Sequence, residues 1–441
     1  MRTFATDALA RFVARSRWED VPAPVRHQAK RTLLNFLGCA LGGCRDPALE
    51  HALAVLRGFS GAPQASVIGR GERLDLLSAS FLNGAAANVH DFDDTHLPTV
   101  IHPAAPVAPA ALALAERSPV AGSALLHAIV LGIEVECRIG NAVTPWHYAR
   151  GWHITSTCGV MGAAAAAGKL LGLDEARLAM ALGIAANQAC GLIESLGSMA
   201  KSVSVGNAPR NGLFSALLAE RGYTASPQTL EGPRGFAHVM GQDPDLAKIT
   251  AGLGSAWESA RNTYKPYPCG IVLHPVIDAL LHLRKHLPCP VDSITRVVVT
   301  GHPLLRQRTD RPGPASGREA QVSLQHTVAV CLAYGAAGLR EFSDAVAAEP
   351  GVQAMGRRVE IVDDAALPVE AARVAVHTAD GGSFTHEVNA PLGSLANPMS
   401  DAQLEAKARA LAAFGGSGCD IGALIGAVWE IEKAKPVRFA C

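Results

Sequence analysis

The sequence has few aromatic residues and no excess of charge of either sign. Aromatic residues make up 5% of the 441 residues, whereas hydrophobic residues of all kinds reach 49%. The core must therefore be built from Ala, Leu and Val, which favours closely packed helices over a β-sandwich. Lysine plus arginine and aspartate plus glutamate both total 39, with no long basic or acidic block. This balance gives no support for a nucleic-acid or membrane-surface partner.

The sequence also lacks long apolar runs and paired cysteines. No stretch of about 20 apolar residues is free of charge and proline, so we expect no membrane span. The opening segment carries charges throughout and does not have the pattern of a signal peptide. The ten cysteines, scattered between Cys39 and Cys441, form no CxxC pair, which argues against a zinc finger or an iron–sulfur cluster. We therefore expect buried, reduced thiols and a cytoplasmic protein.

The chain is too long for one hydrophobic core. A single core rarely grows beyond roughly 250–300 residues, so this chain predicts two domains. In its first part, helical periodicity predicts helices within residues 7–43, 76–89, 106–116, 123–141, 175–190 and 208–222.

The pattern changes after about Tyr264. Alternating, β-branched stretches predict strands over residues 294–300, 358–362, 373–377 and 383–388. Helical patterns over residues 275–286 and 322–334 are mixed with them, and a last helix is predicted over residues 400–414. We therefore expect a mainly α fold, with a large all-helical domain of residues 1–265 together with 395–441 and a smaller α+β domain of residues 266–394.

The most informative segment is residues 83–106, NGAAANVHDFDDTHLPTVIHPAAP. Thirteen consecutive positions hold His90, Asp91, Asp93, Asp94, Thr95, His96 and His102. Carboxylates and imidazoles crowded beside apolar sequence perturb each other's pKa values. Such a cluster suits proton transfer or metal binding, and it is not what a fold needs for stability.

Three further segments carry candidate binding residues. His153 stands beside hydroxyl residues at a predicted helix start, Lys201 precedes a small-residue helix, and Lys265 lies between aromatics and prolines, with His274 following. Two lysines and several histidines that converge on one pocket would suit a substrate with two or three carboxylates.

Plainer explanations exist for each of these residues. A single His or Lys of this kind is more often structural, and Asp93 and Asp94 could cap a helix. A metal site is the sharper alternative, with His90, Asp94, His96 and His102 as possible ligands, although no HExxH or other recognised ligand spacing is present.

Long motifs in the chain resemble the MmgE/PrpD family in order and spacing. They are HDFDDTH, IHPAAPVAPAALALAE, GWHITSTCGVMGAAAAAGKLLGL, AKSVSVGNAPRNGLFSALLAERGYTASPQTLEGPRGF and KPYPCGIVLHPVIDAL. The resemblance runs from about residue 5 to about residue 435. It implies a large helical domain completed by the C-terminal segment, a smaller α+β lid domain, a homodimer, and no required cofactor or metal.

The resemblance also assigns site residues one at a time. The matched positions are Asp91 and Thr95 in DFDDT, His102 in the following HP, His153 in the GxH motif, and the two family lysines, Lys201 and Lys265. Two positions depart from the family pattern. Ser204 stands where a His often follows the first lysine, and His326 stands where the decarboxylase has a Tyr. Both departures disfavour decarboxylase activity.

The family includes 2-methylcitrate dehydratase, cis-aconitate decarboxylase and iminodisuccinate epimerase, whose substrates carry a hydrogen on a carbon next to a carboxylate or imine. We predict a cofactor-independent lyase, most closely a hydro-lyase of the 2-methylcitrate type that acts on a small di- or tricarboxylate. An iminodisuccinate-type epimerase is the alternative among enzymes. A scaffold protein that only binds small polyanions is the alternative of another class.

We expect a definite division of labour in the site. His102 should move the proton, and Asp91 should set its tautomer and orientation. His326 should be either a second proton carrier or a packing residue of its helix. The predicted substrate-binding residues are Thr95, His153, Lys201, Lys265 and His274.

Overall fold

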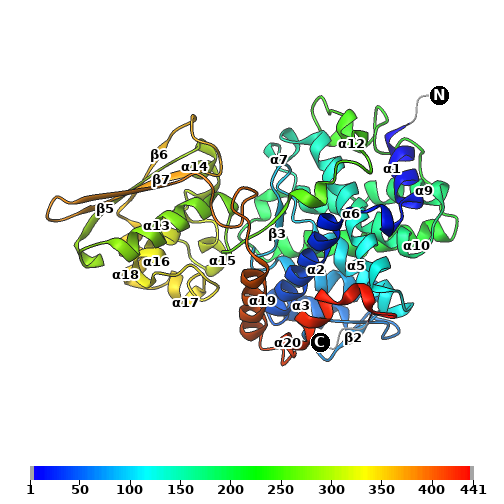
Figure 1. The fold of residues 1–441 in the computed structure, drawn as a ribbon, viewed down its shortest axis with the longest axis horizontal. Helices are drawn as coiled ribbons and strands as arrows, with labels where there is room; N and C mark the ends of the chain where they lie inside the picture. Colours follow the sequence, from blue (N-terminus) through cyan, green and yellow to red (C-terminus); the bar gives the residue numbers. More distant parts are fainter. Residues whose placement is uncertain (1–3, 438–441) are drawn as a thin grey trace.

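The computed structural model describes residues 4–437 and shows two lobes joined side by side (Figure 1). One buried core joins apolar residues between Ala5 and Tyr264 with others between Met399 and Val437. A second core joins residues between Cys269 and Val376. The predicted fold class, mainly α with a smaller α+β part, is confirmed; the domain limits at residues 265 and 395 stay our proposal.

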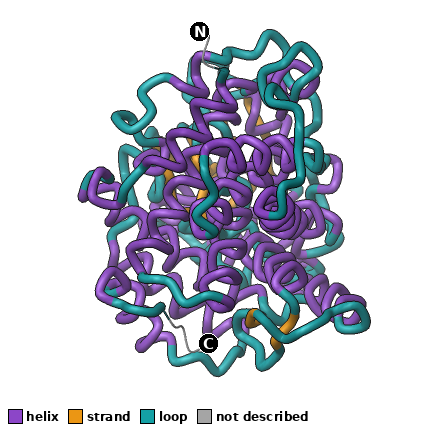
Figure 2. The backbone as a smooth tube through the Cα atoms, turned by 90° about the vertical axis from the view of Figure 1, so that its right-hand side faces the viewer, coloured by secondary structure: helices purple, strands orange, loops and turns teal. Residues whose placement is uncertain are grey.

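The larger lobe is almost entirely helical, and Figure 2 looks onto its helices. Its helices are α1 (Ala5–Arg15), α2 (Ala23–Gly43), α3 (Pro47–Leu56), α4 (Leu76–Asn88), α5 (Ala104–Arg117), α6 (Gly122–Val143), α7 (Trp146–Ala149), α8 (Ile154–Leu170), α9 (Glu175–Ala186), α10 (Ala200–Glu220), α11 (Phe236–Met240), α12 (Ala247–Thr250), α19 (Asp401–Gly415) and α20 (Ile421–Trp429). Its strands form two small antiparallel pairs, β1 (Ala65–Ser66) with β2 (Arg73–Leu74) and β3 (Asp94–His96) with β4 (Asn262–Tyr264). Within the described residues, no helix is long and apolar enough to cross a membrane.

Small residues explain how so many helices pack around α8. This helix is rich in Ala and Gly, and it packs against α5, α6, α9 and α10. A Cβ at Gly162 would lie 2.8 Å from the Gly132 carbonyl oxygen of α6, and one at Gly212 would lie 2.4 Å from the Ala163 Cβ. The low aromatic content is thus matched by helix contacts too close for large side chains.

The smaller lobe contains one four-stranded sheet in the order β6-β5-β7-β8. The strands are β5 (Ile294–Gly301), β6 (Val359–Asp363), β7 (Ala372–Thr378) and β8 (Ser383–Val388), with β5 parallel to β6 and all other pairs antiparallel. Its helices are α13 (His274–His286), α14 (Pro303–Thr309), α15 (Gly317–Ala320), α16 (Leu324–Tyr334), α17 (Asp344–Ala347) and α18 (Pro350–Gly356). Helix α13 packs on β7 and β8, and α16 packs on α13, so the helices bury the sheet's apolar positions.

After the smaller lobe the chain returns to the larger one through α19, which packs along α2. Ser400 caps this helix: its side chain accepts a hydrogen bond from the Gln403 backbone N–H, and the Gln403 side chain accepts one from the Ser400 backbone N–H. Buried apolar residues of this C-terminal segment belong to the core of the larger lobe (Figure 1).

Two predicted helix limits differ from the structure. Helix α9 ends at Ala186, not at residue 190, and α10 begins at Ala200, eight residues before the predicted start at residue 208. Pro209 lies inside α10, and its ring sits against Gly84 of α4. A proline normally marks the start of a helix, so the sequence pattern placed the start of α10 just before Pro209. The packing of Pro209 against α4, which accommodates it inside the helix, could not be predicted from the pattern.

The prediction of reduced thiols holds for most of the cysteines. Among the described residues, eight are free thiols and six of these are buried. Cys419 is an exception because it is disulfide-bonded, and Cys441 lies outside the described residues.

Candidate active site

The acidic–histidine segment forms a strained loop between α4 and α5. Asp91 and Val100 both have positive φ angles, +50° and +56°, which side-chain-bearing residues rarely adopt. Between these two positions, β3 pairs with β4, with Asp94 opposite Tyr264. This pairing places Lys265, the residue after β4, beside the acidic loop, where its N–H donates to the Asp93 carbonyl at 3.4 Å. Strain of this kind persists where surrounding contacts enforce it, often at functional sites.

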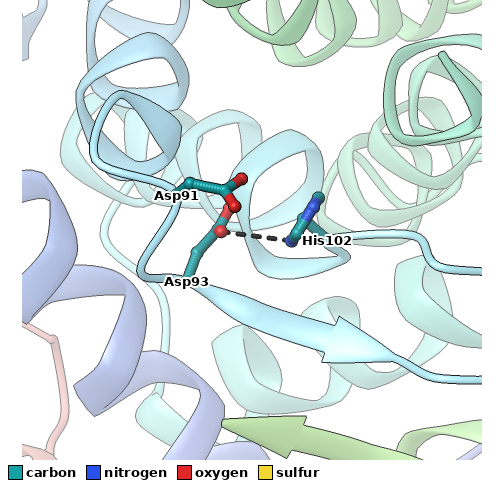
Figure 3. Close-up of side chains that lie close together, drawn as sticks. All are labelled: Asp91, Asp93 and His102. Carbon is teal, nitrogen blue, oxygen red and sulfur yellow. Dashed lines mark ion pairs between the residues drawn. The ribbon is translucent and has the colours of Figure 1, made fainter. Parts of the chain in front are cut away.

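His102 is held through one of its two ring nitrogens, Nδ1. Its Nδ1 lies 2.8 Å from the Asp94 carbonyl oxygen and 3.1 Å from the Asp93 carboxylate, and the ring faces the carboxylates (Figure 3). A carbonyl oxygen only accepts hydrogen bonds, so Nδ1 carries the proton and Nε2 of the neutral ring has a free lone pair. The carboxylate at ion-pair distance from His102 is Asp93, so these contacts favour Asp93 over the predicted Asp91 for the orienting role.

Asp93 is suited to this role because it is buried and charged. Burial raises its pKa, but the neighbouring His102 and Lys265 outweigh burial and leave the pKa below its usual value. Its second oxygen accepts a hydrogen bond from the Asn88 side chain at 2.6 Å. Asn88 is the last residue of α4, so this bond fixes the Asp93 carboxylate against the end of that helix.

Asp91 instead bridges the two predicted lysines. Its carboxylate accepts from the Lys201 Nζ at 2.6 Å and from the Lys265 Nζ at 2.8 Å. Burial raises the pKa of Asp91, but the two ammonium groups hold it well below its usual range. Burial likewise lowers the pKa of Lys265, yet Asp91 and Asp93 raise it overall. Two ammonium groups thus share one carboxylate, so the trio keeps a net positive charge.

His153 joins this group from the start of α8. Its Nδ1 lies 3.2 Å from the Ser204 hydroxyl, and the Ser204 hydroxyl itself donates to the Lys201 carbonyl at 2.9 Å. Burial, with help from Lys201 and His102, lowers the pKa of His153 to about 3. His153 is therefore neutral, and its Nδ1 is oriented by two hydroxyls, that of Ser204, which departs from the family pattern, and that of Ser156 at 3.3 Å.

Thr95 and His274 complete the predicted set. The Thr95 hydroxyl lies 3.3 Å from the His102 Nδ1. His274, at the start of α13, is buried, and no described residue provides a hydrogen-bond partner for its Nε2. Burial and Lys265 lower its pKa to about 3, so it is neutral. A buried nitrogen without a partner calls for an explanation, and a polar group of a bound substrate is one.

His326 lies apart from these contacts. Its Nε2 is 2.8 Å from the Glu341 carbonyl oxygen, and its ring packs against Phe342. Among the described residues it makes no hydrogen bond to Asp91, Asp93 or His102. These contacts favour the packing role over the catalytic one.

Lys407 belongs to the site's support and was not predicted. This buried lysine of α19 donates to the Asn35 side chain at 2.7 Å, to the Lys265 carbonyl at 2.8 Å and to the Phe92 carbonyl. It thereby ties the acidic loop to the Lys265 segment. A signal was present, because Lys407 shares a helix face with Leu404, Ala408 and Leu411, where a charge needs a reason.

The four residues named as possible metal ligands have other partners. His96 is bonded to Thr99 and Glu258, and the His90 Nε2 lies 3.1 Å from the Gly42 carbonyl. Ligand atoms of Asp91, Asp93 and His102 do lie within 4.8 Å of one another. Since both Asp91 oxygens already accept from lysine ammonium groups, an added cation would compete with two fixed charges. Metal independence stays a prediction.

The fold and these residues are typical of an enzyme that acts on a small anion. A histidine with a fixed tautomer lies beside two lysine ammonium groups that can bind such an anion. The chain belongs to the MmgE/PrpD family. The model of the family's N-terminal domain matches residues 7–248, and that of its C-terminal domain matches residues 267–430.

The alignments with its relatives cover nearly the whole chain. The cis-aconitate decarboxylase of Aspergillus terreus is 32% identical over 426 residues, covering 89% of this chain and 86% of that protein. The cis-aconitate decarboxylase of Homo sapiens is 30% identical over 427 residues, covering 93% and 88%. That of Mus musculus is 29% identical over 403 residues. This chain is similar to those proteins and is an enzyme of their family.

Proposed function

We propose that this protein is a cofactor-independent lyase that removes a proton from a carbon next to a carboxylate of a small di- or tricarboxylate. The observation that carries the proposal is the arrangement of His102. Its Nδ1–H donates a hydrogen bond to the Asp94 carbonyl oxygen at 2.8 Å, so Nε2 is the nitrogen that can act as the base. Lys201 and Lys265 both donate hydrogen bonds to the neighbouring Asp91. Geometry of this kind is the first requirement of a general base.

The first chemical step follows from these contacts. The His102 Nε2 takes the proton, and the electron pair of the broken C–H bond spreads onto the adjacent carboxylate. Lys201 and Lys265 stabilise the added negative charge, since both side chains lie at ion-pair distance from Asp91 within the site. Asp93 stabilises the imidazolium that forms at His102. His153 and His274 stay neutral and offer hydrogen bonds without adding charge.

We favour dehydration as the second step, as in a hydro-lyase of the 2-methylcitrate type. The electron pair on carbon forms a double bond, the neighbouring C–O bond breaks, and the leaving oxygen takes the proton from the His102 imidazolium and departs as water. Ser204 and His326 support this choice, because both depart from the family pattern associated with decarboxylation.

Decarboxylation is the second candidate, and the names of the relatives favour it. The C–C bond to a carboxylate would break, carbon dioxide would leave, and the electron pair of that bond would stay on the remaining carbon framework. His102, entering this reaction as an imidazolium, would then donate its proton to that carbon. No proton is first removed from carbon on this path, so His102 acts as the acid, and at about 30% identity the relatives' activity is a proposal here.

A substrate panel separates these outcomes. We would assay 2-methylcitrate, citrate, cis-aconitate and an iminodisuccinate by absorbance for alkene, by carbon dioxide release and by proton NMR in deuterium oxide, with and without a chelator. Alkene without carbon dioxide supports the hydro-lyase, and carbon dioxide supports the decarboxylase. Deuterium exchange without either supports the epimerase alternative. Neither turnover nor exchange with any polyanion contradicts the proposal and favours a scaffold protein.

We also propose that the protein is a homodimer in which α10 lies at the interface. Val203 and Phe214, on one stripe of this helix, are 50% and 41% exposed, so they form an apolar stripe that a partner could cover. Val203 is two residues from Lys201, so a partner here would lie beside the site. Sedimentation of Val203→Asp and Phe214→Asp variants checks this; dimers that survive both changes would contradict it.

A further inference from the structure

Arg308 is a cation of the smaller lobe that the site described so far does not use. It lies near the end of α14, a half-buried side chain whose guanidinium stands over the Tyr148 ring of α7, 5.2 Å from the ring centroid. This contact links the two lobes. Within residues 4–437, no hydrogen bond or ion pair involves the guanidinium, whereas Arg306 on the same helix pairs with Asp363.

Tyr148 connects this arginine to the candidate site. Burial raises the pKa of Tyr148, while the nearby Arg308 lowers it and Asp91 raises it, which places the phenol in the electrostatic reach of both groups. Its hydroxyl makes no hydrogen bond to another described residue. Arg308 therefore stands over a ring that lies five residues before His153 in the chain and within electrostatic reach of Asp91.

The charges of the site leave a place for Arg308. As the base, His102 carries no charge, so Asp91 offsets one of the two charges of Lys201 and Lys265 and Asp93 offsets the other. The groups described so far therefore have no surplus positive charge, and the two ammonium groups serve one substrate carboxylate. A second or third carboxylate needs another cation, and a guanidinium held over an aromatic face presents its donors in the fixed fork that carboxylates accept.

We propose that Arg308 binds a substrate carboxylate remote from the reacting carbon, held in position by the Tyr148 ring, and so makes the protein selective for polycarboxylates. This inference rests on the proposed function for its substrate class, but not on the reaction. The larger lobe would hold the reacting end of the substrate and the smaller lobe the remote end.

The test is a binding measurement that needs no turnover. Calorimetric titration of the full protein with tricarballylate and with succinate compares ligands of three and two carboxylates. We expect the wild type to prefer tricarballylate, Arg308→Met to weaken tricarballylate about 10- to 100-fold and lose the preference, and Arg308→Lys to recover part of it. Tyr148→Phe should keep the preference and Tyr148→Leu should reduce it.

Arg150→Met is the matched control, because Arg150 is an exposed arginine over the Trp146 ring, 5.9 Å from its centroid, two residues from Tyr148. It should bind both ligands like the wild type. An unchanged preference in Arg308→Met, with a wild-type melting temperature, overturns the inference, as does a wild type that binds neither ligand. A protein that binds tricarballylate through Arg308 but turns over no substrate would refute the lyase and keep this inference.

Discussion

The two lobes contribute to the candidate site in different ways. In the larger lobe, Asp91, Asp93 and His102 each have partners at hydrogen-bond or ion-pair distance. These partners belong to the same lobe, or, for Lys265, directly follow its strand β4. In the smaller lobe, the Arg308 guanidinium has an aromatic ring beneath it and no hydrogen bond or ion pair with the described residues, and His326 is bonded to a carbonyl of its own lobe. Fixed partners suit proton transfer, and an unpaired cation suits recognition. We infer that the larger lobe performs the chemistry and the smaller lobe selects the substrate.

The largest expected effect separates the two histidines that were candidates for proton transfer. His102→Gln should lower kcat by roughly 10²–10⁴, as for a lost general acid–base group. His326→Gln should leave kcat near normal, since its ring nitrogen is bonded to the Glu341 carbonyl. Steady-state rates of both variants check this. The reverse result would move the chemistry to the smaller lobe and break the comparison.

Next in size is the loss of the group that orients His102. Asp93→Asn should lower kcat by about 10–100-fold with little change in KM, because the amide cannot stabilise an imidazolium as a carboxylate does. Asp91→Asn should raise KM as well, since it disturbs both lysines. Equal kinetic effects of the two substitutions would contradict the separate roles assigned to these carboxylates.

The lysines should show a mixed effect. Lys201→Met and Lys265→Met should each raise KM and lower kcat, because these ammonium groups bind the substrate before the transition state and also stabilise charge within it. The change should be greater for Lys265, which also donates to the Asp91 and Cys269 carbonyls and is 3% exposed. A rise in KM alone would restrict both lysines to substrate binding.

The last prediction concerns the stability of the fold, not activity, and the buried Asp94. Burial and then Asp93 raise its pKa from the ordinary 3.8 to about 7. The folded state therefore binds more protons than the unfolded state between these values, so the free energy of unfolding falls as pH rises from 3.8 to about 7, by at most about 1.4 kcal/mol per pH unit. Asp94→Asn should flatten that fall in urea titrations. An unchanged slope would mean that Asp94 is not protonated near neutral pH.

The periodic parts of the fold were predictable, and the close contacts of the site were not. The strands β5–β8 and the capped helix α19 follow from local alternation and capping. The β3–β4 pairing involves three residues on each side, too short for any pattern, yet it brings Lys265 to Asp91.

Candidate residues could be found in the sequence, but their pairings could not. Asp91 and Asp93 are two positions apart and equally acidic, and only the backbone turn at Asp91, with its φ of +50°, decides which one meets His102. Arg308 and Tyr148 are far apart in the sequence and carry no local signal at all.

The central claim is that His102, fixed by Asp93 and the Asp94 carbonyl, moves a proton at a carbon next to a carboxylate. Proton NMR in deuterium oxide measures this step directly, by the incorporation of deuterium into substrate recovered before turnover is complete or into product. We predict incorporation at that carbon with the wild type and with His326→Gln, and loss of most of the incorporation rate with His102→Gln. Undiminished incorporation with His102→Gln would contradict the account.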